Sequence, residues 1–166
     1  MLKRLHHNAY RCRDSEETRK FYEDFLGLPL VNAFPIGETK TGRATSALHS
    51  FYQMDDGSCL AFFEVPDMPF EFKTQHDYDL HIALEVTQED LHKMLEKGKR
   101  AGIDTRGISD HGFIDSIYFR DPNGYVIELT AKTPGHDQAM DPARNDARAK
   151  LERWQAAKKQ PESAKS

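Results

Sequence analysis

The chain has 166 residues, enough to bury a hydrophobic core in one compact domain. Its 23 Lys and Arg face 27 Asp and Glu, and the formal net charge of −4 gives no reason to expect nucleic acid as a partner. The first residues lack the apolar core of a signal peptide, and no stretch reaches the ~20 apolar residues of a membrane span. We therefore expect a cytoplasmic protein without membrane contact, in which Cys12 and Cys59 are reduced.

The first half of the chain predicts a strand, a helix and three further strands. Residues 5–12 form the first expected strand, and a helix is expected from Ser15 to Phe25, before the helix-ending Gly27. Residues 36–46, rich in Gly, Thr and Lys, are expected to form an inserted loop. The Asp56-Gly57 pair predicts a hairpin turn before a strand over residues 59–65, which carries Glu64.

The second half repeats this order. A strand over residues 80–86 is expected to lead into a helix from Gln88 to Arg100. The Asn123-Gly124 pair predicts the matching turn, followed by a strand over residues 125–130 that carries Glu128. The chain is therefore interpreted as two βαβββ modules, about 1–72 and 76–134. Beyond them, we expect an appended helix over residues 142–157, capped by Asp141, and a disordered tail over residues 158–166.

Histidines and glutamates occupy similar positions in both modules. His7 and His81 each precede an alanine by two residues, and Glu64 and Glu128 each lie in an otherwise apolar last strand. Because a buried unpaired carboxylate is strongly disfavoured, each glutamate needs a cation, an arginine or a metal as partner. A lone strand histidine is usually a hydrogen-bonded core or surface residue, but two histidines with one or two carboxylates suit a divalent ion. We therefore predict a metal site whose candidate ligands are His7, His81, Glu128 and Glu64.

Several segments between about Leu2 and Thr130 match the motifs of a known family: His7 with Asp14, Phe21-Tyr22, Leu26-Gly27-Leu28, Glu64, His81-Ile82-Ala83, and Asp121 to Glu128. In these segments the chain resembles the vicinal oxygen chelate superfamily, which includes glyoxalase I, extradiol ring-cleaving dioxygenases and bleomycin- or fosfomycin-resistance proteins. The resemblance implies an α+β fold in which the two modules form a curved, partly open, eight-stranded mixed sheet around a metal. Residues 1–134 are then expected to form a single domain, and residues 135–166 the carboxy-terminal helix and tail.

Within the superfamily, the second module resembles the extradiol dioxygenase motif, from which it departs at Ser109. The resemblance implies that His111 is an acid–base catalyst, that Tyr118 hydrogen-bonds a bound catechol oxygen, and that Glu128 binds the metal with His7 and His81. The implied cofactor is one Fe²⁺ or Mn²⁺ per site, and the implied substrate is a small molecule such as an aromatic diol. A purely structural alternative for His111 and Tyr118 remains, because this hairpin occurs throughout the superfamily.

Two other functions are consistent with the same residues. With Glu64 as fourth ligand, the chain resembles glyoxalase I or an epimerase, a lyase or isomerase that uses Ni²⁺, Zn²⁺ or Co²⁺. Alternatively, resistance relatives keep this fold as metal-free drug-binding proteins. A homodimer is plausible because an open sheet leaves edges to cover, and the site lies either within one chain or across the dimer. The remaining histidines are expected in loops or in solvent: His6, His49, His76, His92 and His136.

Overall fold

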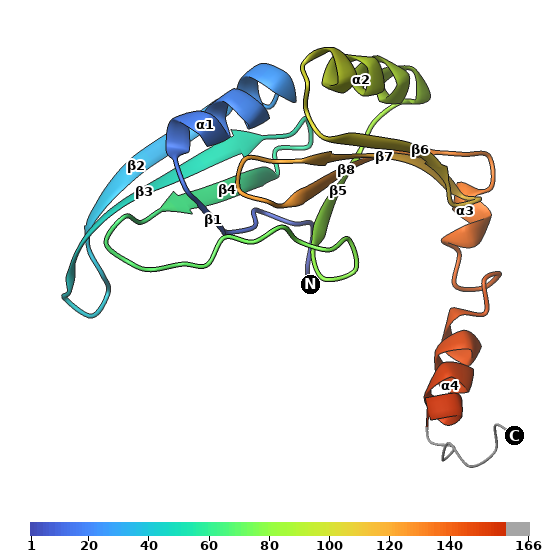
Figure 1. Cartoon of the computed structure of the whole chain (residues 1–166). Coiled ribbons are helices and arrows are strands. Elements are labelled where there is room, and N and C mark those ends of the chain that lie inside the picture. The colour runs from blue at the N-terminus through green and yellow to red at the C-terminus, as the bar shows by residue number, and fades with distance from the viewer. Residues whose placement is uncertain (159–166) are drawn as a thin grey trace, which may run out of the picture. The chain divides into compact units, whose positions relative to one another are not determined.

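The computed structural model describes residues 1–158 and shows an α+β fold with two four-stranded mixed sheets (Figure 1). The strand order is β1-β4-β3-β2 in the first sheet and β5-β8-β7-β6 in the second. The chain forms two compact units. Of the described residues, unit 1 comprises Met1–Ile82 and Phe119–Ile127, and unit 2 comprises Ala83–Tyr118 and residues 128–158.

In the first sheet, β1 (Tyr10–Cys12) pairs parallel with β4 (Cys59–Glu64), and β3 (Ala44–Gln53) pairs antiparallel with β4 and with β2 (Leu30–Glu38). The prediction of a loop over residues 36–46 is wrong. The β2–β3 hairpin continues through most of this segment, with Ile36 opposite Ala47. Only residues 39–43 connect the strands, and Gly42 supplies the positive φ of the turn, at 81°. Cross-strand pairing therefore overrides the loop-like composition of this segment.

One face of the first sheet packs against a helix that changes geometry along its length. The helix α1 (Ser15–Arg19) continues directly into the π-helical segment η1 (Lys20–Phe25), where Leu26 N–H donates to Phe21 O. Asp14 caps the start by accepting from Glu17 N–H at 2.8 Å. The helix expected over residues 15–25 is confirmed, whereas its π-helical half gave no signal in the sequence.

The buried side of this helix is aromatic. The Tyr22 ring lies 4.6 Å from that of Phe62 and 5.6 Å from that of Tyr52, measured between centroids. All three side chains are at most 1% exposed. These rings form the core between the helix and the sheet, so the opposite face of the sheet is left for other contacts.

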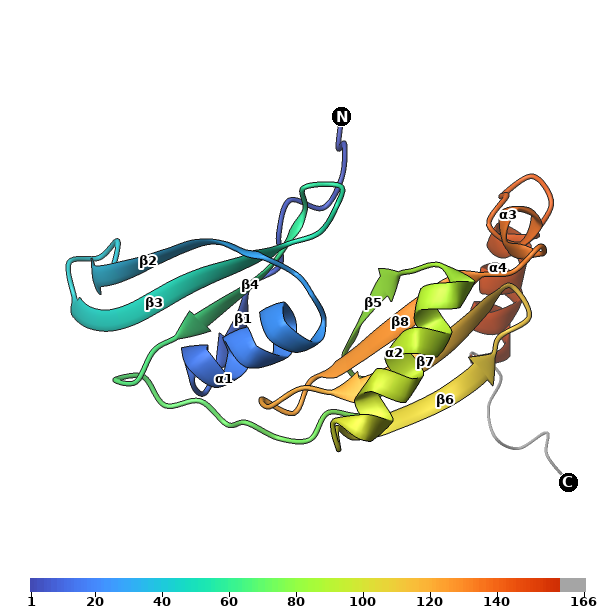
Figure 2. The same cartoon turned by 90° about the horizontal axis from the view of Figure 1, so that it is seen from above.

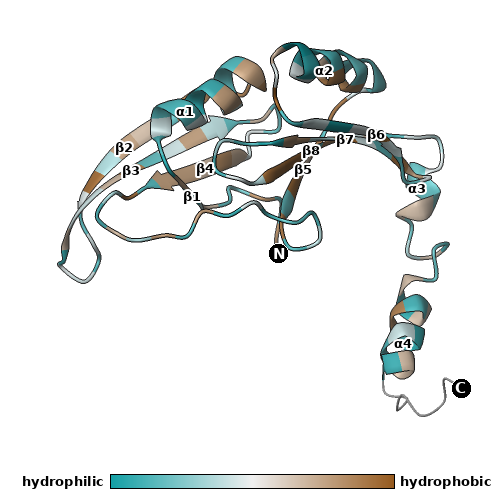
Figure 3. Ribbon diagram, viewed as in Figure 1, coloured by the Kyte–Doolittle hydropathy of each residue, from teal (hydrophilic) through white to brown (hydrophobic). Residues whose placement is uncertain are grey.

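The second sheet contains β5 (His81–Glu85), β6 (Thr105–Asp110), β7 (Ile114–Arg120) and β8 (Val126–Lys132). The helix α2 (Gln88–Arg100) lies across one face of β6, β7 and β8 (Figure 2) and has the predicted bounds. Thr87 caps it, and Leu91 and Leu95 are buried on its inner side. Figure 3 shows the apolar character of β8, in which Ile127 and Leu129 are at most 3% exposed.

The turn between β7 and β8 is held by a buried hydrogen-bond network within unit 1. Asp121 is 4% exposed, and its Oδ1 accepts from the backbone N–H groups of Asn123 and Tyr125. Its Oδ2 accepts from the Tyr22 hydroxyl at 2.9 Å, and Asn123 Oδ1 accepts from Arg13 N–H at 2.8 Å. The turn is thereby fixed to the helix and to the residue that follows β1.

The carboxy-terminal segment contains the short helix α3 (His136–Ala139) and the helix α4 (Ala147–Lys158). The appended helix starts five residues later than expected, because Asp141 accepts from Ala143 N–H in a preceding turn and Asn145 accepts from Ala147 N–H. The rest of the expected tail, residues 159–166, lies outside the described residues. Within residues 1–158, no helix is long and apolar enough to cross a membrane.

Candidate metal and substrate site

The face of the second sheet that points away from α2 carries several of the predicted site residues. Along β8, Glu128 and Thr130 share a face, and Ser116 Oγ on β7 lies 3.4 Å from Thr130 Oγ1. Tyr118 follows Ser116 by two residues and so points to the same side. Lys132 on β8 pairs with Glu85 on β5 at 2.9 Å, and both residues belong to unit 2. Glu128 is buried here, with 5% exposure.

His111 and Tyr118 are brought into direct contact within unit 2. His111 Nε2 lies 2.9 Å from Tyr118 Oη, and the guanidinium carbon of Arg106 lies 5.1 Å from the centre of the Tyr118 ring. His111 N–H donates to Ile114 O, which fixes the backbone between β6 and β7. The histidine and tyrosine selected from the sequence therefore form a hydrogen-bonded pair.

The His81 ring is oriented by the carbonyl of Asp77, which lies 2.6 Å from His81 Nδ1. A carbonyl only accepts, so this bond requires the proton on Nδ1. In the neutral ring, the lone pair then lies on Nε2, as in histidines that bind metals through Nε2 and donate through the other nitrogen. The local geometry of His81 therefore fits a ligand role.

His7 lies in the first sheet, where it forms a single parallel bridge to Cys59 beside β4. Its ring lies 5.3 Å from Phe51 and 6.1 Å from His49, between centroids, and its Nδ1 is 2.7 Å from His6 Nδ1. Neighbouring rings extend this surface, which faces away from α1. We call it the aromatic face, and it comprises His7, Phe34, His49, Phe51 and Phe63.

His49 belongs to this face, and the sequence gave it no role. It was expected in a loop or in solvent, and this is wrong: it lies within β3 and is 6% exposed. Its ring stacks on Phe63 at 3.6 Å, and its Nδ1 lies 2.9 Å from Phe62 O, so Nδ1 carries the proton. The alternation of β3, with Phe51 two residues later on the same face, was the available signal.

Glu64 points to the opposite face of the first sheet. Its register partner on β1 is Cys12, and its Oε2 accepts from Ser15 N–H at 2.7 Å, at the start of α1. The carboxylate thus has a backbone partner at a helix amino terminus, where negative charge is favourable. Ala61, which is paired with Phe51, occupies the face that carries His7.

No group of three or more His, Cys, Asp or Glu side chains within residues 1–158 is arranged to hold a metal ion. Of the four predicted ligands, His81 lies on β5 and Glu128 on β8, His7 lies on the aromatic face of the first sheet, and Glu64 faces α1. The donor chemistry still fits a divalent cation: two imidazoles and a buried carboxylate, with the proton of the His81 imidazole on Nδ1.

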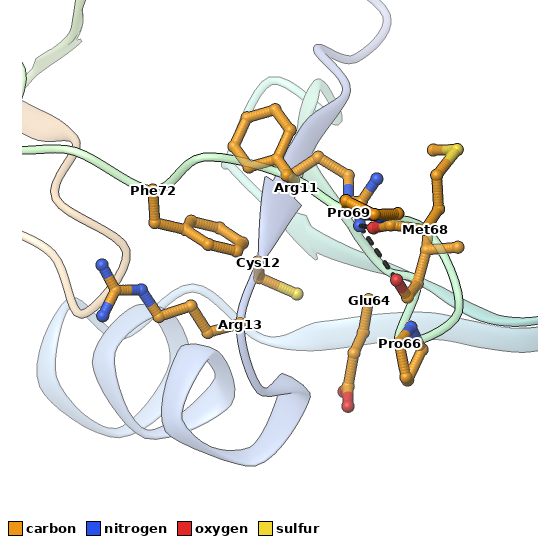
Figure 4. A pocket seen from close by; sticks show the side chains of 10 residues that line it. Arg11, Cys12, Arg13, Glu64, Pro66, Met68, Pro69 and Phe72 are labelled. Atoms are coloured by element: carbon orange, nitrogen blue, oxygen red, sulfur yellow. Dashed lines mark hydrogen bonds between the residues drawn. The ribbon is translucent and has the colours of Figure 1, made fainter.

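A pocket of about 220 Å³ lies in unit 1, at the β1 edge of the first sheet (Figure 4). Arg11 lies in its lining, where its Nη2 donates to Val65 O at 2.9 Å and Met68 O at 2.8 Å, and its guanidinium lies over Phe70. Arg11 thus fastens the segment that follows β4.

Comparison with known proteins gives a family match over most of the chain. Residues 4–129 match the model of the Glyoxalase/Bleomycin resistance protein/Dioxygenase superfamily. The chain is 30% identical over 142 residues to a lactoylglutathione lyase of Neisseria meningitidis serogroup A, covering 81% of this chain and 94% of the relative. It is 29% identical over 135 residues to the putative ring-cleaving dioxygenase MhqA of Bacillus subtilis, covering 79% of this chain and 41% of that protein.

The fold is also found in a fosfomycin resistance protein, FosX of Listeria monocytogenes, whose crystal structure contains Mn(II) and sulfate. The TM-score is 0.60 at 20% sequence identity, covering 82% of this chain and 98% of FosX. Both matched relatives carry the names of enzymes, and FosX shows that this fold can hold a divalent metal. The chain therefore belongs to the glyoxalase/bleomycin resistance/dioxygenase superfamily, the vicinal oxygen chelate proteins.

Proposed function

We propose that the protein is a metal-dependent dioxygenase that opens the ring of a catechol-type substrate, with His7, His81 and Glu128 as metal ligands. The observation that carries this proposal is the 2.9 Å contact between His111 Nε2 and Tyr118 Oη in unit 2, the unit that also contains Glu128. A protonatable pair of this kind, together with a bound metal, has the parts that an oxygen-dependent ring cleavage requires.

The bound metal would supply a Lewis acid with open positions for substrate and dioxygen. Tyr118 Oη, held by His111 Nε2, would donate a hydrogen bond to a substrate oxygen, and the imidazole would carry a proton between substrate and product. One ring C–C bond beside a hydroxyl breaks, both atoms of dioxygen enter the product, and no additional reductant is needed.

The aromatic face supports a planar substrate. His49 and Phe63 stack at 3.6 Å, and Phe51 lies 4.3 Å from His49 between centroids. Such surfaces bind an aromatic ring through dispersion and offset stacking. Since Nδ1 of His49 is held by Phe62 O, we include His49 Nε2 in the proposal as a second group that exchanges a proton with substrate.

A glyoxalase-like lyase or isomerase is the second candidate, because the lactoylglutathione lyase relative is 30% identical over most of both chains. The four-ligand form of that site would need Glu64, whose carboxylate is bound to Ser15 N–H on the face toward α1. The geometry therefore favours three ligands. A metal-free binding protein is less favoured, since it has no need for the Nδ1-protonated His81 and the buried Glu128.

The test is anaerobic reconstitution with Fe²⁺ or Mn²⁺, followed by dioxygen and a panel of catechols. We expect oxygen uptake equal to catechol consumed and a new visible absorption from the ring-opened product. The same preparations, and others loaded with Ni²⁺, Zn²⁺ or Co²⁺, are assayed with the hemithioacetal of methylglyoxal and glutathione. Turnover of the hemithioacetal alone would replace the dioxygenase proposal by the lyase. Binding of a test compound without turnover and without metal would replace both by a metal-free binding protein.

Domain organisation and assembly are part of the same proposal. We propose that residues 1–134 form the catalytic domain, that the following segment is an appendage, and that the protein is a cytoplasmic homodimer. A chain ending at residue 134 should keep the metal affinity of the full chain. Light scattering of both forms, with and without metal, measures the number of chains in the particle.

A further inference from the structure

The residues that lead into His81 are fastened to the turn between β7 and β8. Gln75 N–H donates to Gly124 O at 3.0 Å, and Arg120 Nη1 donates both to Gln75 O and to Gly124 O at 3.0 Å. One guanidinium nitrogen thus joins the turn to the segment between β4 and β5, residues 65–80, which we call the linker. All of these residues, and His81, belong to unit 1.

Gly124 makes this contact possible. Its φ is +96°, and a Cβ placed there would lie 2.5 Å from Lys73 O and 3.1 Å from Lys73 C. Real Cβ atoms do not approach backbone that closely, so any side chain at this position would push the linker away. The turn and the linker pack backbone against backbone.

The fastened linker continues into a tight turn that ends at the candidate ligand. His76 O accepts from Asp79 N–H at 2.9 Å and from Leu80 N–H at 3.2 Å. The carbonyl of Asp77, inside this turn, lies 2.6 Å from His81 Nδ1. The position of that carbonyl therefore depends on where the linker is held, and the proton on the His81 ring depends on that carbonyl.

We propose that Arg120 is a positioning residue for the metal site: its clamp on Gln75 O and Gly124 O fixes the Asp77 carbonyl and thereby keeps His81 in the Nδ1-protonated tautomer. This inference rests on the proposed function, in which His81 Nε2 binds the metal. When outer partners of a metal-binding histidine are removed, metal affinity falls by roughly 10–100-fold. Arg120 acts here through backbone atoms, so the side chain of Gln75 has no part in the clamp.

The experiment compares full-length wild type with Arg120→Met, Arg120→Lys and Gln75→Ala. Mn²⁺ affinity is measured by isothermal titration calorimetry, and the tautomer of His81 in the metal-free protein by ¹⁵N–¹H correlation of labelled histidine. We expect about 10-fold weaker Mn²⁺ binding and a mixed tautomer in Arg120→Met, since it lacks the donors. Arg120→Lys, which keeps one point donor, should recover part of both, and Gln75→Ala should match wild type.

The outcomes separate the two proposals. Equal Mn²⁺ affinity and an unchanged His81 tautomer in Arg120→Met would overturn the clamp and leave the proposed function standing. A wild type that binds no metal would overturn the proposed function. The His81 tautomer in metal-free Arg120→Met would still show whether Arg120 holds the Asp77 carbonyl in place. If Arg120→Met does not fold, Gln75→Pro tests the same contact by removing the N–H that donates to Gly124, with a mixed tautomer again expected.

Discussion

The last strands of the two sheets, β4 and β8, follow similar turns but carry their acids on different faces. Counted from the turn glycine, Ala61 follows Gly57 by four residues, as Glu128 follows Gly124. Glu64 lies three residues beyond Ala61, an odd step that reverses its face and directs it to Ser15 N–H. The two modules thus share an architecture but differ in the surroundings of their glutamates, because an odd offset along a strand places a side chain on the opposite face of the sheet.

The largest expected effect distinguishes Glu128 from Glu64. Glu128→Gln should weaken Mn²⁺ binding by more than about 100-fold, since a lost ligand costs more than a lost outer partner. Glu64→Gln should leave the affinity unchanged and lower the free energy of unfolding by about 0.5–2 kcal/mol, through its contact at the start of α1. Calorimetric titration and thermal unfolding measure the two quantities. Weaker Mn²⁺ binding in Glu64→Gln than in wild type would contradict this prediction and support a site with four ligands.

The next largest effect is expected from the His111–Tyr118 pair of the second sheet, which we propose transfers a proton. His111→Gln should lower kcat by about 10²–10⁴-fold and remove one limb of the pH profile, because the transferred proton loses its carrier. Tyr118→Phe, which keeps the ring under Arg106, should lose less. Metal affinity should not change in either variant. An unaltered pH profile in His111→Gln would assign proton transfer elsewhere, and His49→Gln is then the next variant to compare.

The network at the β7–β8 turn joins that turn to η1 within unit 1. Tyr22→Phe removes the hydroxyl that donates to Asp121 Oδ2 and should cost about 1–2 kcal/mol of unfolding free energy. Asp121→Asn replaces an acceptor that faces several donors and should cost about 2–4 kcal/mol. Denaturant unfolding measures both. Equal losses in the two variants would contradict a network centred on the carboxylate.

The smallest effect concerns the thiol that shares a face with Glu64. Burial raises the pKa of Cys12 to about 11. At pH 8 the folded protein therefore holds little thiolate, and iodoacetamide should alkylate Cys12 only on unfolding. The raised pKa also means that stability falls as the pH rises above about 9, where the unfolded thiol ionises first. A Cys12→Ala variant should lack that part of the alkaline loss.

The sequence by itself determined the order of the elements, because periodicity, turn pairs and the duplicated His-x-Ala are local signals. Its motifs indicated the family, and the same resemblance selected His111 and Tyr118 as candidates. The bounds of α2 and the helix from Ser15 to Phe25 follow from capping residues and helix-ending glycines in the same way. These features depend on near neighbours along the chain, which the sequence shows directly.

Only the tertiary structure decided which side chains share a surface. His49 is a buried member of the aromatic face because β3 pairs with β4 in a register that places it over Phe63. Glu64 is satisfied by Ser15 N–H because β1 returns beside β4, and Arg120 reaches the segment before His81 through backbone carbonyls. Strand register and contacts with backbone atoms join residues far apart in the chain. Alternation along β3 indicates that His49 and Phe51 share a face, but it does not show which residues of β4 they meet.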